Sequence, residues 1–339
     1  MIDTSFKNQE AFCHLFRLLS EENPVIFSPY EGSDDLEMET RHWEKEADEK
    51  GGEIKEIEFK RKGITILPTE IACLTQLTFI SLPKNGLSEL PKEIGLLTNC
   101  CVINLRENQL TRLPEEIGKL ANLKLLGLVK NQLEEFPKSI GKLSALIFLH
   151  VSHNKLTTLP EEISGLTQLE ELDITDNQIT SLPRKTGEMV GLRKLEIWNN
   201  QIAELPESIV HLSNLEELQA FGNRLTSLPK GIEQLTRLTT LNLNVNQFSE
   251  FPLEVTQMTQ MEALTFKCNQ LPSIPQEIGR MKNLEWLIIG DNPITHLPKE
   301  IADLTKLECL GISNTPLEDI PKEVEDLLPK LTAFEGYRS

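Results

Sequence analysis

Residues 123–145 read LKLLGLVKNQLEEFPKSIGKLSA, and residues 146–168 read LIFLHVSHNKLTTLPEEISGLTQ. The two stretches align without a gap, and their leucine-type residues, one asparagine and one proline stand at the same places. Such self-similarity at a fixed period of 23 residues is the signature of a repeat protein whose units stack in a row. The asparagines in this register are Asn85, Asn108, Asn131, Asn154, Asn177, Asn200, Asn223, Asn246, Asn269 and Asn292, and the prolines are Pro68, Pro91, Pro114, Pro137, Pro160, Pro183, Pro206, Pro229, Pro252, Pro275, Pro298 and Pro321.

Each position that recurs from repeat to repeat has a physical reason. Leu126 and Leu128 alternate with outward residues, which predicts a short strand, and successive strands should stack in parallel on the concave side of a solenoid. The amide of Asn131 both donates and accepts, so a ladder of asparagines is expected to satisfy backbone groups of neighbouring coils. Pro137 has a fixed φ and no N–H, which favours the first position of a short helix on the convex side.

The repeat pattern resembles a known family. L-x-x-L-x-L-x-x-N-x-L matches the leucine-rich-repeat signature. The extension L-P-x-x-I-G-x-L resembles the 23-residue subclass of plant Ras-group, animal Ras-suppressor-like and similar bacterial proteins, over residues 54–328. The resemblance implies an α/β fold, a leucine-rich-repeat solenoid curved like a horseshoe. It also implies a signalling adaptor that contacts a small GTPase, while the strict regularity equally suits a bacterial effector delivered into a host cell.

The two ends of the array depart from the pattern. Lys62 replaces the asparagine in the first repeat, and Thr315 replaces it in the last. Beyond the last repeat the register slips, because Leu331 arrives one residue late. We therefore expect a solenoid of about twelve repeats over residues 53–328 and a C-terminal tail or cap over residues 329–339.

Residues 1–52 are expected to form an N-terminal helical cap, because a stack of repeats needs a cover at each end. Segment 8–20 has helical spacing of apolar residues, and segment 35–50 reads as a second, highly charged helix. The alternative is that the first of these helices is a separate partner-docking element. The apolar residues of the first helix are Ala11, Phe12, Leu15, Phe16, Leu18 and Leu19.

The charge balance limits the partners. Lys plus Arg number 34 and Asp plus Glu number 52, so the net charge is −18. Nucleic-acid affinity depends on Lys and Arg displacing counterions, and anionic membranes attract basic segments, so neither a nucleic acid nor a membrane is expected as partner. A protein or peptide with a basic or mixed basic and apolar surface is the expected partner.

The cysteines and the N-terminus indicate the compartment. The six cysteines have no paired spacing, which predicts free thiols in a reducing environment. The first residues, MIDTSFKNQEAFCHLFRLL, contain no uninterrupted apolar stretch, so no signal peptide is expected and the predicted location is cytoplasmic. Delivery by a dedicated secretion system would not require a signal peptide, so the sequence does not exclude it.

The outward side chains of the strands carry the functional information, because they have no packing role. Counting back from the asparagine, they stand at minus six, minus four and minus two, in rows that cross the sheet. The minus-six row begins with an apolar strip, which is covered by the N-terminal helix, by the chain just before each strand, or by an external partner. In the minus-two row Trp198 and Phe221 are lateral neighbours beside an acidic cluster, which suits a basic segment stacking on the aromatics. The candidate partner-binding residues are Trp198, Phe221, Asp173, Glu196, Glu171, Glu217, His150, Phe148, Phe79 and Trp286.

Catalysis and metal binding are the rival interpretations. His150 stands one repeat before Asp173, and His153 one repeat before Asp176. The two histidines lie roughly 10 Å apart along an extended chain, so ordinary histidine–carboxylate pairing is the favoured interpretation. The sequence holds no glycine-rich phosphate loop, G-x-S-x-G or H-E-x-x-H. We therefore expect a monomeric, non-catalytic interaction scaffold without cofactor or metal. The alternative is a carbohydrate or small-ligand receptor.

Overall fold

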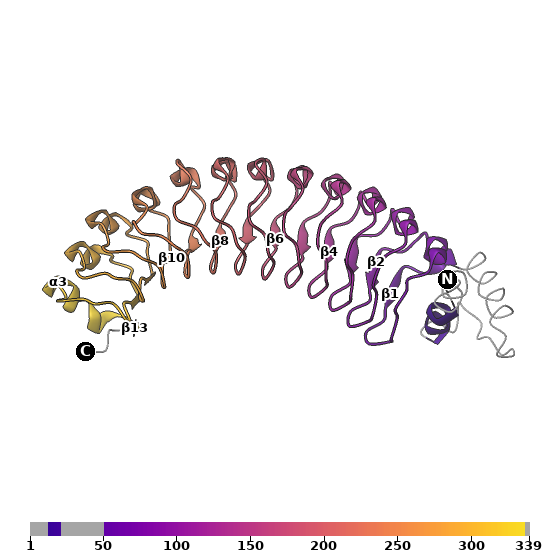
Figure 1. The fold of residues 1–339 in the computed structure, drawn as a ribbon, viewed down its shortest axis with the longest axis horizontal. Helices are drawn as coiled ribbons and strands as arrows, with labels where there is room; N and C mark the ends of the chain where they lie inside the picture. The colour runs from indigo at the N-terminus through magenta and orange to yellow at the C-terminus, as the bar shows by residue number, and fades with distance from the viewer. Residues whose placement is uncertain (1–12, 22–50, 336–339) are drawn as a thin grey trace. The chain divides into compact units, whose positions relative to one another are not determined.

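The computed structural model describes residues 13–21 and 51–335 and divides the chain into two compact units, Met1–Leu169 and Glu170–Ser339. Each unit is a row of repeats, and each repeat contributes one three-residue strand and, in most cases, one short 3₁₀ helix (Figure 1). Strands and helices lie on opposite faces of the row. This confirms the predicted leucine-rich-repeat solenoid.

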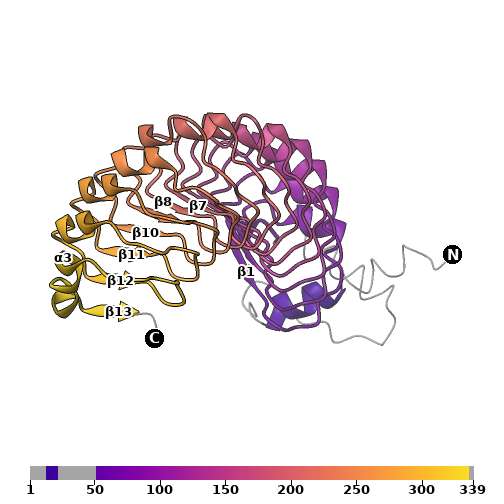
Figure 2. The same ribbon diagram turned by 60° about the vertical axis from the view of Figure 1, so that its left-hand side comes forward.

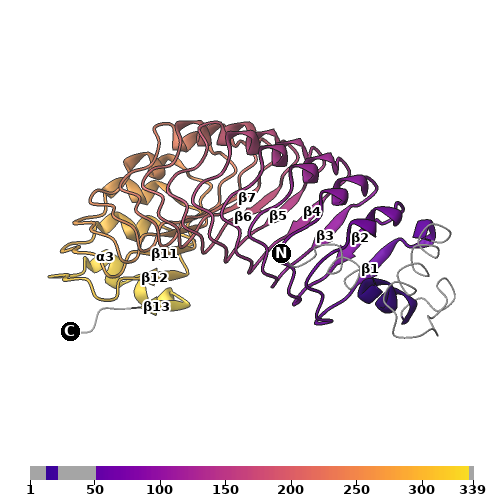
Figure 3. The same ribbon diagram turned by 45° about the vertical axis from the view of Figure 1, so that its right-hand side comes forward.

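The first unit contains strands β1 to β5, which pair in parallel in sequence order (Figure 3). Ile57 of β1 stands beside Ile80 of β2, so adjacent strands pair residues that are 23 positions apart. The elements are η1 Gly51–Glu53, β1 Glu56–Glu58, η2 Thr69–Cys73, β2 Phe79–Ser81, η3 Lys92–Leu96, β3 Val102–Asn104, η4 Glu115–Lys119, β4 Leu125–Gly127, η5 Lys138–Lys142, β5 Phe148–His150 and η6 Glu161–Gly165.

The second unit contains strands β6 to β13, and Figure 2 shows β10 to β13 side by side. Within the segment 329–339 that was assigned to a C-terminal tail or cap, residues 333–335 form β13, which pairs with β12. Cys309 stands beside Ala333, a step of 24 residues, so the register slip is real and the sheet continues across it. The elements are β6 Glu171–Asp173, η7 Thr186–Glu188, β7 Lys194–Glu196, η8 Glu207–His211, β8 Glu217–Gln219, η9 Ile232–Gln234, β9 Thr240–Asn242, η10 Leu253–Gln257, β10 Ala263–Thr265, η11 Gln276–Arg280, β11 Trp286–Ile288, η12 Lys299–Asp303, β12 Cys309–Gly311, α3 Lys322–Glu325, η13 Leu328–Lys330 and β13 Ala333–Glu335.

The core of each coil is made of the apolar residues that define the repeat. In the repeat that starts at Leu123, the side chains of Leu126, Leu128, Leu133 and Ile140 are 0% exposed. Full burial of one such side chain stabilises the fold by roughly 1.5–3 kcal/mol. Because every repeat supplies the same set, stacking produces one continuous apolar core along each unit.

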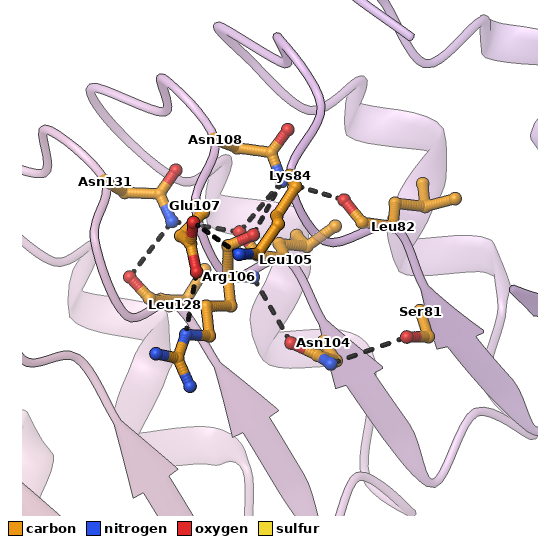
Figure 4. A network of polar contacts seen from close by, with 10 residues as sticks. All are labelled: Ser81, Leu82, Lys84, Asn104, Leu105, Arg106, Glu107, Asn108, Leu128 and Asn131. Atoms are coloured by element: carbon orange, nitrogen blue, oxygen red, sulfur yellow. Dashed lines mark hydrogen bonds and ion pairs between the residues drawn. The ribbon is translucent and has the colours of Figure 1, made fainter. Parts of the chain in front are cut away.

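The asparagine ladder is present as predicted (Figure 4). The Oδ1 atom of Asn131 accepts the N–H of Leu110 in the preceding repeat at 3.0 Å. Its Nδ2 group donates to the carbonyls of Leu105 and Leu128, each at 3.0 Å. One asparagine therefore ties together the turns of two adjacent coils. At the C-terminal end the hydroxyl of Thr315 keeps only the bond within its own repeat, to the carbonyl of Ile312 at 2.6 Å.

The residue before each asparagine position adopts a left-handed backbone conformation. In the first unit this holds for Arg61, Lys84, Glu107, Lys130 and His153, with φ between 56° and 59°. Left-handed geometry at non-glycine residues is uncommon, and it turns the chain sharply at the end of each strand. Their side chains are therefore presented in the same way in every repeat.

The helices on the opposite face begin one residue later than predicted. Pro137 has φ −66° and ψ 148° and is the residue before η5, so it caps the helix and is not its first residue. Extended ψ is compatible with the residue before a helix and not with a helical residue. Two repeats also depart in length, since η7 begins at Thr186 and η9 at Ile232, three residues after the proline of each repeat.

Residues 13–21 are helical, within and just beyond the predicted segment 8–20. The side chains of Leu15, Phe16 and Leu19 are 0% exposed. A ring nitrogen of His14, Nε2, lies 3.0 Å from the carbonyl oxygen of Lys62, which joins this helix to the first repeat. The predicted helix over residues 35–50 lies outside the described residues. No helix within the described ranges has the length and apolar content needed to cross a bilayer.

None of the six cysteines is joined in a disulfide bond. Cys13, Cys100 and Cys309 are buried, whereas Cys268 is exposed. Burial raises the pKa of Cys100 to about 12, so this thiol stays protonated at neutral pH.

Candidate protein-interaction face

The outward rows lie where the alternation of the strands places them. In β7 the central Leu195 is buried, and its neighbours Lys194 and Glu196 are half-buried on the opposite side. The same pattern recurs in most other strands of the second unit. We call the surface formed by the minus-six, minus-four and minus-two positions the strand face. Most of its side chains are half-buried or exposed, whereas a few, such as Ser81, Thr175 and Cys309, are buried.

Trp198 and Phe221 are brought together on the strand face of the second unit. Their ring centroids are 6.3 Å apart and their planes are inclined at 52°. Tilted rings at this separation attract each other through their quadrupoles. Because each ring covers part of the other, both are half-buried, and the pair presents a preformed apolar platform.

The acidic cluster beside this pair contains a lysine. The Lys194 ammonium lies 3.0 Å from Glu196 and 3.9 Å from Glu217. Asp173 accepts the backbone N–H of Thr175 at 3.0 Å, which holds its carboxylate at the end of β6. The cluster therefore consists of four carboxylates (Glu171, Asp173, Glu196 and Glu217) around one cation, and its net charge remains negative.

Burial and mutual repulsion shift the ionisation of this cluster. Burial raises the pKa of Glu196, Asp173 and Glu171 push it in the same direction, and Lys194 offsets part of the rise. Burial opposes the charge of Lys194, but its hydrogen bond to Glu196 and the surrounding carboxylates outweigh this and raise its pKa. An added cation from a partner would relieve the repulsion among the carboxylates.

A chain of polar side chains begins within this cluster on β8 and extends across two further strands, β9 and β10. Gln219 donates to Glu217 at 2.7 Å, and Asn242 donates to Gln219 at 2.9 Å. Thr265 in turn donates to Asn242 at 2.9 Å. These bonds orient donors and acceptors before any partner arrives, which lowers the entropic cost of binding.

The first unit carries the predicted apolar strip. Phe79, Val102, Leu125 and Phe148 occupy successive strands, and each is half-buried. The rings of Phe148 and His150, on the same strand, have centroids 6.2 Å apart. The strip is thus continuous along the unit, but none of its members is among the exposed large apolar residues.

Trp286 is the aromatic side chain of the strand face with the greatest exposure, at 47%. It belongs to β11, separated from β7 by the polar chain described above. Ile288 lies on the same side of the same strand and packs over Gly311 of β12, where an added Cβ would come within 2.9 Å of Ile288. Trp286 and Ile288 therefore form a second, smaller apolar patch in this unit.

The described residues do not support a metal site. Within 13–21 and 51–335, no three His, Cys, Asp or Glu side chains lie together in a way that would hold an ion. His150 and His153 belong to the first unit, and Asp173 and Asp176 to the second.

Two features of the strand face were missed in the sequence. The first is the pairing of Lys194 with Glu196 and Glu217. Glu196 stands two residues after Lys194 on the same strand, and Glu217 stands one repeat after it. That spacing is a usable signal, because it defines lateral and same-side neighbours in a parallel sheet. The second is the polar chain, whose signal is the run of amide and hydroxyl residues at minus four in β8 to β10.

Comparison with known proteins identifies the family to which the repeats belong. A family model described as a leucine-rich repeat region matches residues 102–181 and 172–273. No curated protein gives a match to this sequence. Among solved structures, an LRR protein of Leptospira interrogans is 34% identical with a TM-score of 0.71, and the alignment covers 86% of each chain.

Two further solved structures are also similar. The peptide hormone receptor RGFR1, solved in complex with RGF2, is 27% identical with a TM-score of 0.64. The complex PEPR1–AtPEP1 gives 26% identity and a TM-score of 0.72. The alignments cover 82% and 84% of this chain but only 50% and 45% of the two other chains. The repeat signature, the parallel strands, the asparagine ladder and these matches agree that the chain belongs to the leucine-rich repeat proteins.

Proposed function

We propose that this protein is a non-catalytic scaffold that binds a partner protein or peptide through its strand face, with Trp198 and Phe221 at the centre of the contact. The observation that carries the proposal is the aromatic pair, 6.3 Å between centroids, beside a carboxylate cluster that holds a single lysine. Trp and other aromatic residues are enriched at the energetic centres of interfaces. The partner segment is basic, or mixed basic and apolar.

The chemistry of recognition follows from the arrangement. An arginine or lysine of the partner stacks on Trp198 and pairs with a carboxylate of Glu196 or Glu217. The preformed polar chain from Gln219 to Thr265 offers hydrogen bonds to the backbone of an extended segment. Trp286 supplies an apolar contact further along the unit. Electrostatic attraction to the acidic chain accelerates the encounter.

The comparisons support a peptide or protein as partner. One of the similar structures is a plant peptide hormone receptor in complex with RGF2, and another is PEPR1–AtPEP1. This chain spans about half of each of those chains, so the likeness supports the class of ligand only.

The test is binding of a defined basic peptide, such as an arginine-rich sequence with interspersed leucines, measured by isothermal titration calorimetry. The double variant Trp198→Ala/Phe221→Ala is expected to weaken binding by at least about tenfold, since removing a hot-spot residue costs roughly 2 kcal/mol or more. Affinity capture with wild-type and double-variant bait then identifies natural partners that depend on the same pair.

Trp286→Ala serves for comparison, because it removes one aromatic side chain that the proposal places away from the centre of the contact. It should weaken binding less than the double variant. Equal affinity of wild type and double variant for every captured protein and for the basic peptide would refute the proposal.

The second candidate function is a carbohydrate or small-ligand receptor, favoured by an open aromatic pair beside hydrogen-bonding amides. A glycan array separates the two. Saturable glycan binding that is lost in the double variant, together with no capture of protein, would replace the first proposal by the second.

We also propose that the chain belongs to the 23-residue Ras-group subclass and acts as a monomeric signalling adaptor or bacterial effector. The uninterrupted 23-residue register and the Leptospira structure support this. Residues 1–52 are proposed to cap the array, in line with the bond from His14 to Lys62. Light scattering of the purified chain tests the monomer, and a dimer mass would contradict it.

A further inference from the structure

One edge of the first unit is basic in a chain whose net charge is −18. The edge is formed where each strand turns into the following loop, at positions minus two to plus one around the asparagine. In the first five repeats these positions hold seven lysines and arginines and one glutamate, whereas in the seven repeats of the second unit they hold two basic and two acidic residues. We call these seven residues the basic edge: Lys60, Arg61, Lys62, Lys84, Arg106, Lys130 and Lys155.

Most side chains of the basic edge are accessible. Lys60, Arg61, Lys62, Lys130 and Lys155 are exposed, and the side chain of Arg106 is 53% exposed, whereas Lys84 is half-buried with its side chain 32% exposed. Arg61, Lys84 and Lys130 share the left-handed backbone position, so they are presented alike at steps of one or two repeats. Adjacent repeats in a parallel sheet lie about 5 Å apart, which makes the edge a continuous row of cations.

Glu107 shows how this edge holds a carboxylate. One of its oxygens lies 3.2 Å from the Lys84 ammonium, and the other lies 3.3 Å from Nε of Arg106. The terminal nitrogens of Arg106 point away from Glu107 (Figure 4). The ion pair with Lys84, together with the charges of Lys130 and Arg106, lowers the pKa of Glu107, so the carboxylate is ionised at neutral pH. Asn104 accepts the backbone N–H of Arg106 at 3.2 Å and thereby fixes the turn that carries both residues.

We infer that the basic edge is a second binding surface, one that takes an acidic segment of a partner protein, with Asp or Glu side chains lying between cations of successive repeats as Glu107 does. Acidic side chains on one side of an extended peptide recur about every 7 Å, comparable to the one- to two-repeat steps of the edge. This surface lies in the first unit and is independent of the proposed role of Trp198 and Phe221.

A nucleic acid fits the edge less well. Single-stranded nucleic acids are bound by stacking of bases on aromatic side chains, and none of the edge positions in the first five repeats is Phe, Tyr or Trp. A long polyanion would also extend over the acidic remainder of the chain, whereas a short acidic segment contacts only the edge.

The experiment measures anisotropy of a fluorescein-labelled oligo-glutamate peptide with the full chain at low ionic strength. Lys84→Glu/Arg106→Glu/Lys130→Glu should weaken binding by at least about tenfold, and the neutral variant Lys84→Gln/Arg106→Gln/Lys130→Gln should weaken it less. Glu107→Gln removes the internal competitor and should strengthen binding about twofold to fivefold. Added salt should weaken binding of the wild type, because it screens exposed charges.

The matched control is Lys92→Glu/Lys119→Glu/Lys142→Glu, which changes the net charge equally on exposed lysines of η3, η4 and η5. It should alter the affinity by less than about twofold. Equal loss in this control, or unchanged affinity in the neutral variant, would overturn the proposal. So would tighter binding of an oligonucleotide or of phosphatidylserine vesicles through the same residues. Trp198→Ala/Phe221→Ala should leave oligo-glutamate binding unchanged, which separates this surface from the proposed protein-binding face.

Discussion

Replacement of Asn131 by alanine tests the ladder that holds the coils together. Asn131 accepts the N–H of Leu110 and donates to the carbonyls of Leu105 and Leu128. Each of these carbonyls also accepts a bond from another asparagine, Leu105 from Asn108 and Leu128 from Asn154. In the variant each of these two carbonyls therefore keeps one donor. The buried N–H of Leu110, in contrast, loses its acceptor.

The magnitude follows from this difference. An unsatisfied buried backbone group costs roughly 1–3 kcal/mol, and each redundant bond contributes about 0.5–1 kcal/mol. We therefore expect Asn131→Ala to lower the free energy of unfolding by about 2–5 kcal/mol. The control is Asn122→Ala, nine residues before Asn131, where an exposed side chain makes one bond to the carbonyl of Thr98 at 2.9 Å. It should cost about 0.5–1 kcal/mol.

The assay is urea unfolding followed by far-ultraviolet circular dichroism. Asn131→Asp adds a pH test, because its carboxylate would face two carbonyls and its pKa would be raised in the folded state. A raised pKa in the folded state means that the stability of this variant is highest below the unfolded pKa of about 3.9 and falls as pH rises through the folded value. A smaller loss for Asn131→Ala than for Asn122→Ala would refute the argument that the buried ladder stabilises the stack.

Three further predictions concern the backbone and the thiols. Val245→Asn should raise the thermal midpoint and stabilise the fold by about 0.5–1 kcal/mol, because a β-branched residue at φ 51° is strained and asparagine tolerates this conformation. Gly222→Ala should destabilise the fold more than Gly63→Ala, as measured by chemical denaturation. Both glycines have positive φ, but an added Cβ would collide with the Asn199 side chain at Gly222 and would meet nothing at Gly63. Iodoacetamide at pH 8 should label Cys101 and leave Cys100 unmodified in the folded protein, because the pKa of Cys100, about 12, keeps its thiol protonated. Mass spectrometry of the native and urea-unfolded chain measures the labelling. Rapid labelling of Cys100 in the native protein would contradict its burial.

The arrangement of the repeats could be predicted from the sequence because every repeat contacts chiefly its neighbours. A residue such as Leu126 meets residues 23 positions away, and the same position recurs there, so a local pattern determines the packing. The ladder of asparagines and the rows of the strand face follow from the same periodicity. The helix start was predicted one residue early, since proline suits both the capping and the first helical position.

The sequence predicts which residues form the candidate site, but it does not predict the burial and the ion pairs of their side chains. Trp198 and Phe221 were expected to be neighbours from their shared position in successive repeats, and their rings do meet. Their half-burial, and the pairing of Lys194 with Glu196, depend on side-chain rotamers that a pattern does not contain. The role of the chosen residues in binding stays a prediction.

The order of the strands, the 23-residue register and the composition of the core were determined by the sequence alone, because each is a property of one repeat multiplied along the chain. The tertiary structure decided the left-handed turn before each asparagine, the continuation of the sheet into β13 across a step of 24 residues, and the contact of Glu107 with two cations. These depend on where neighbouring coils place backbone carbonyls and side-chain ends in space. Such positions emerge only when the repeats are stacked.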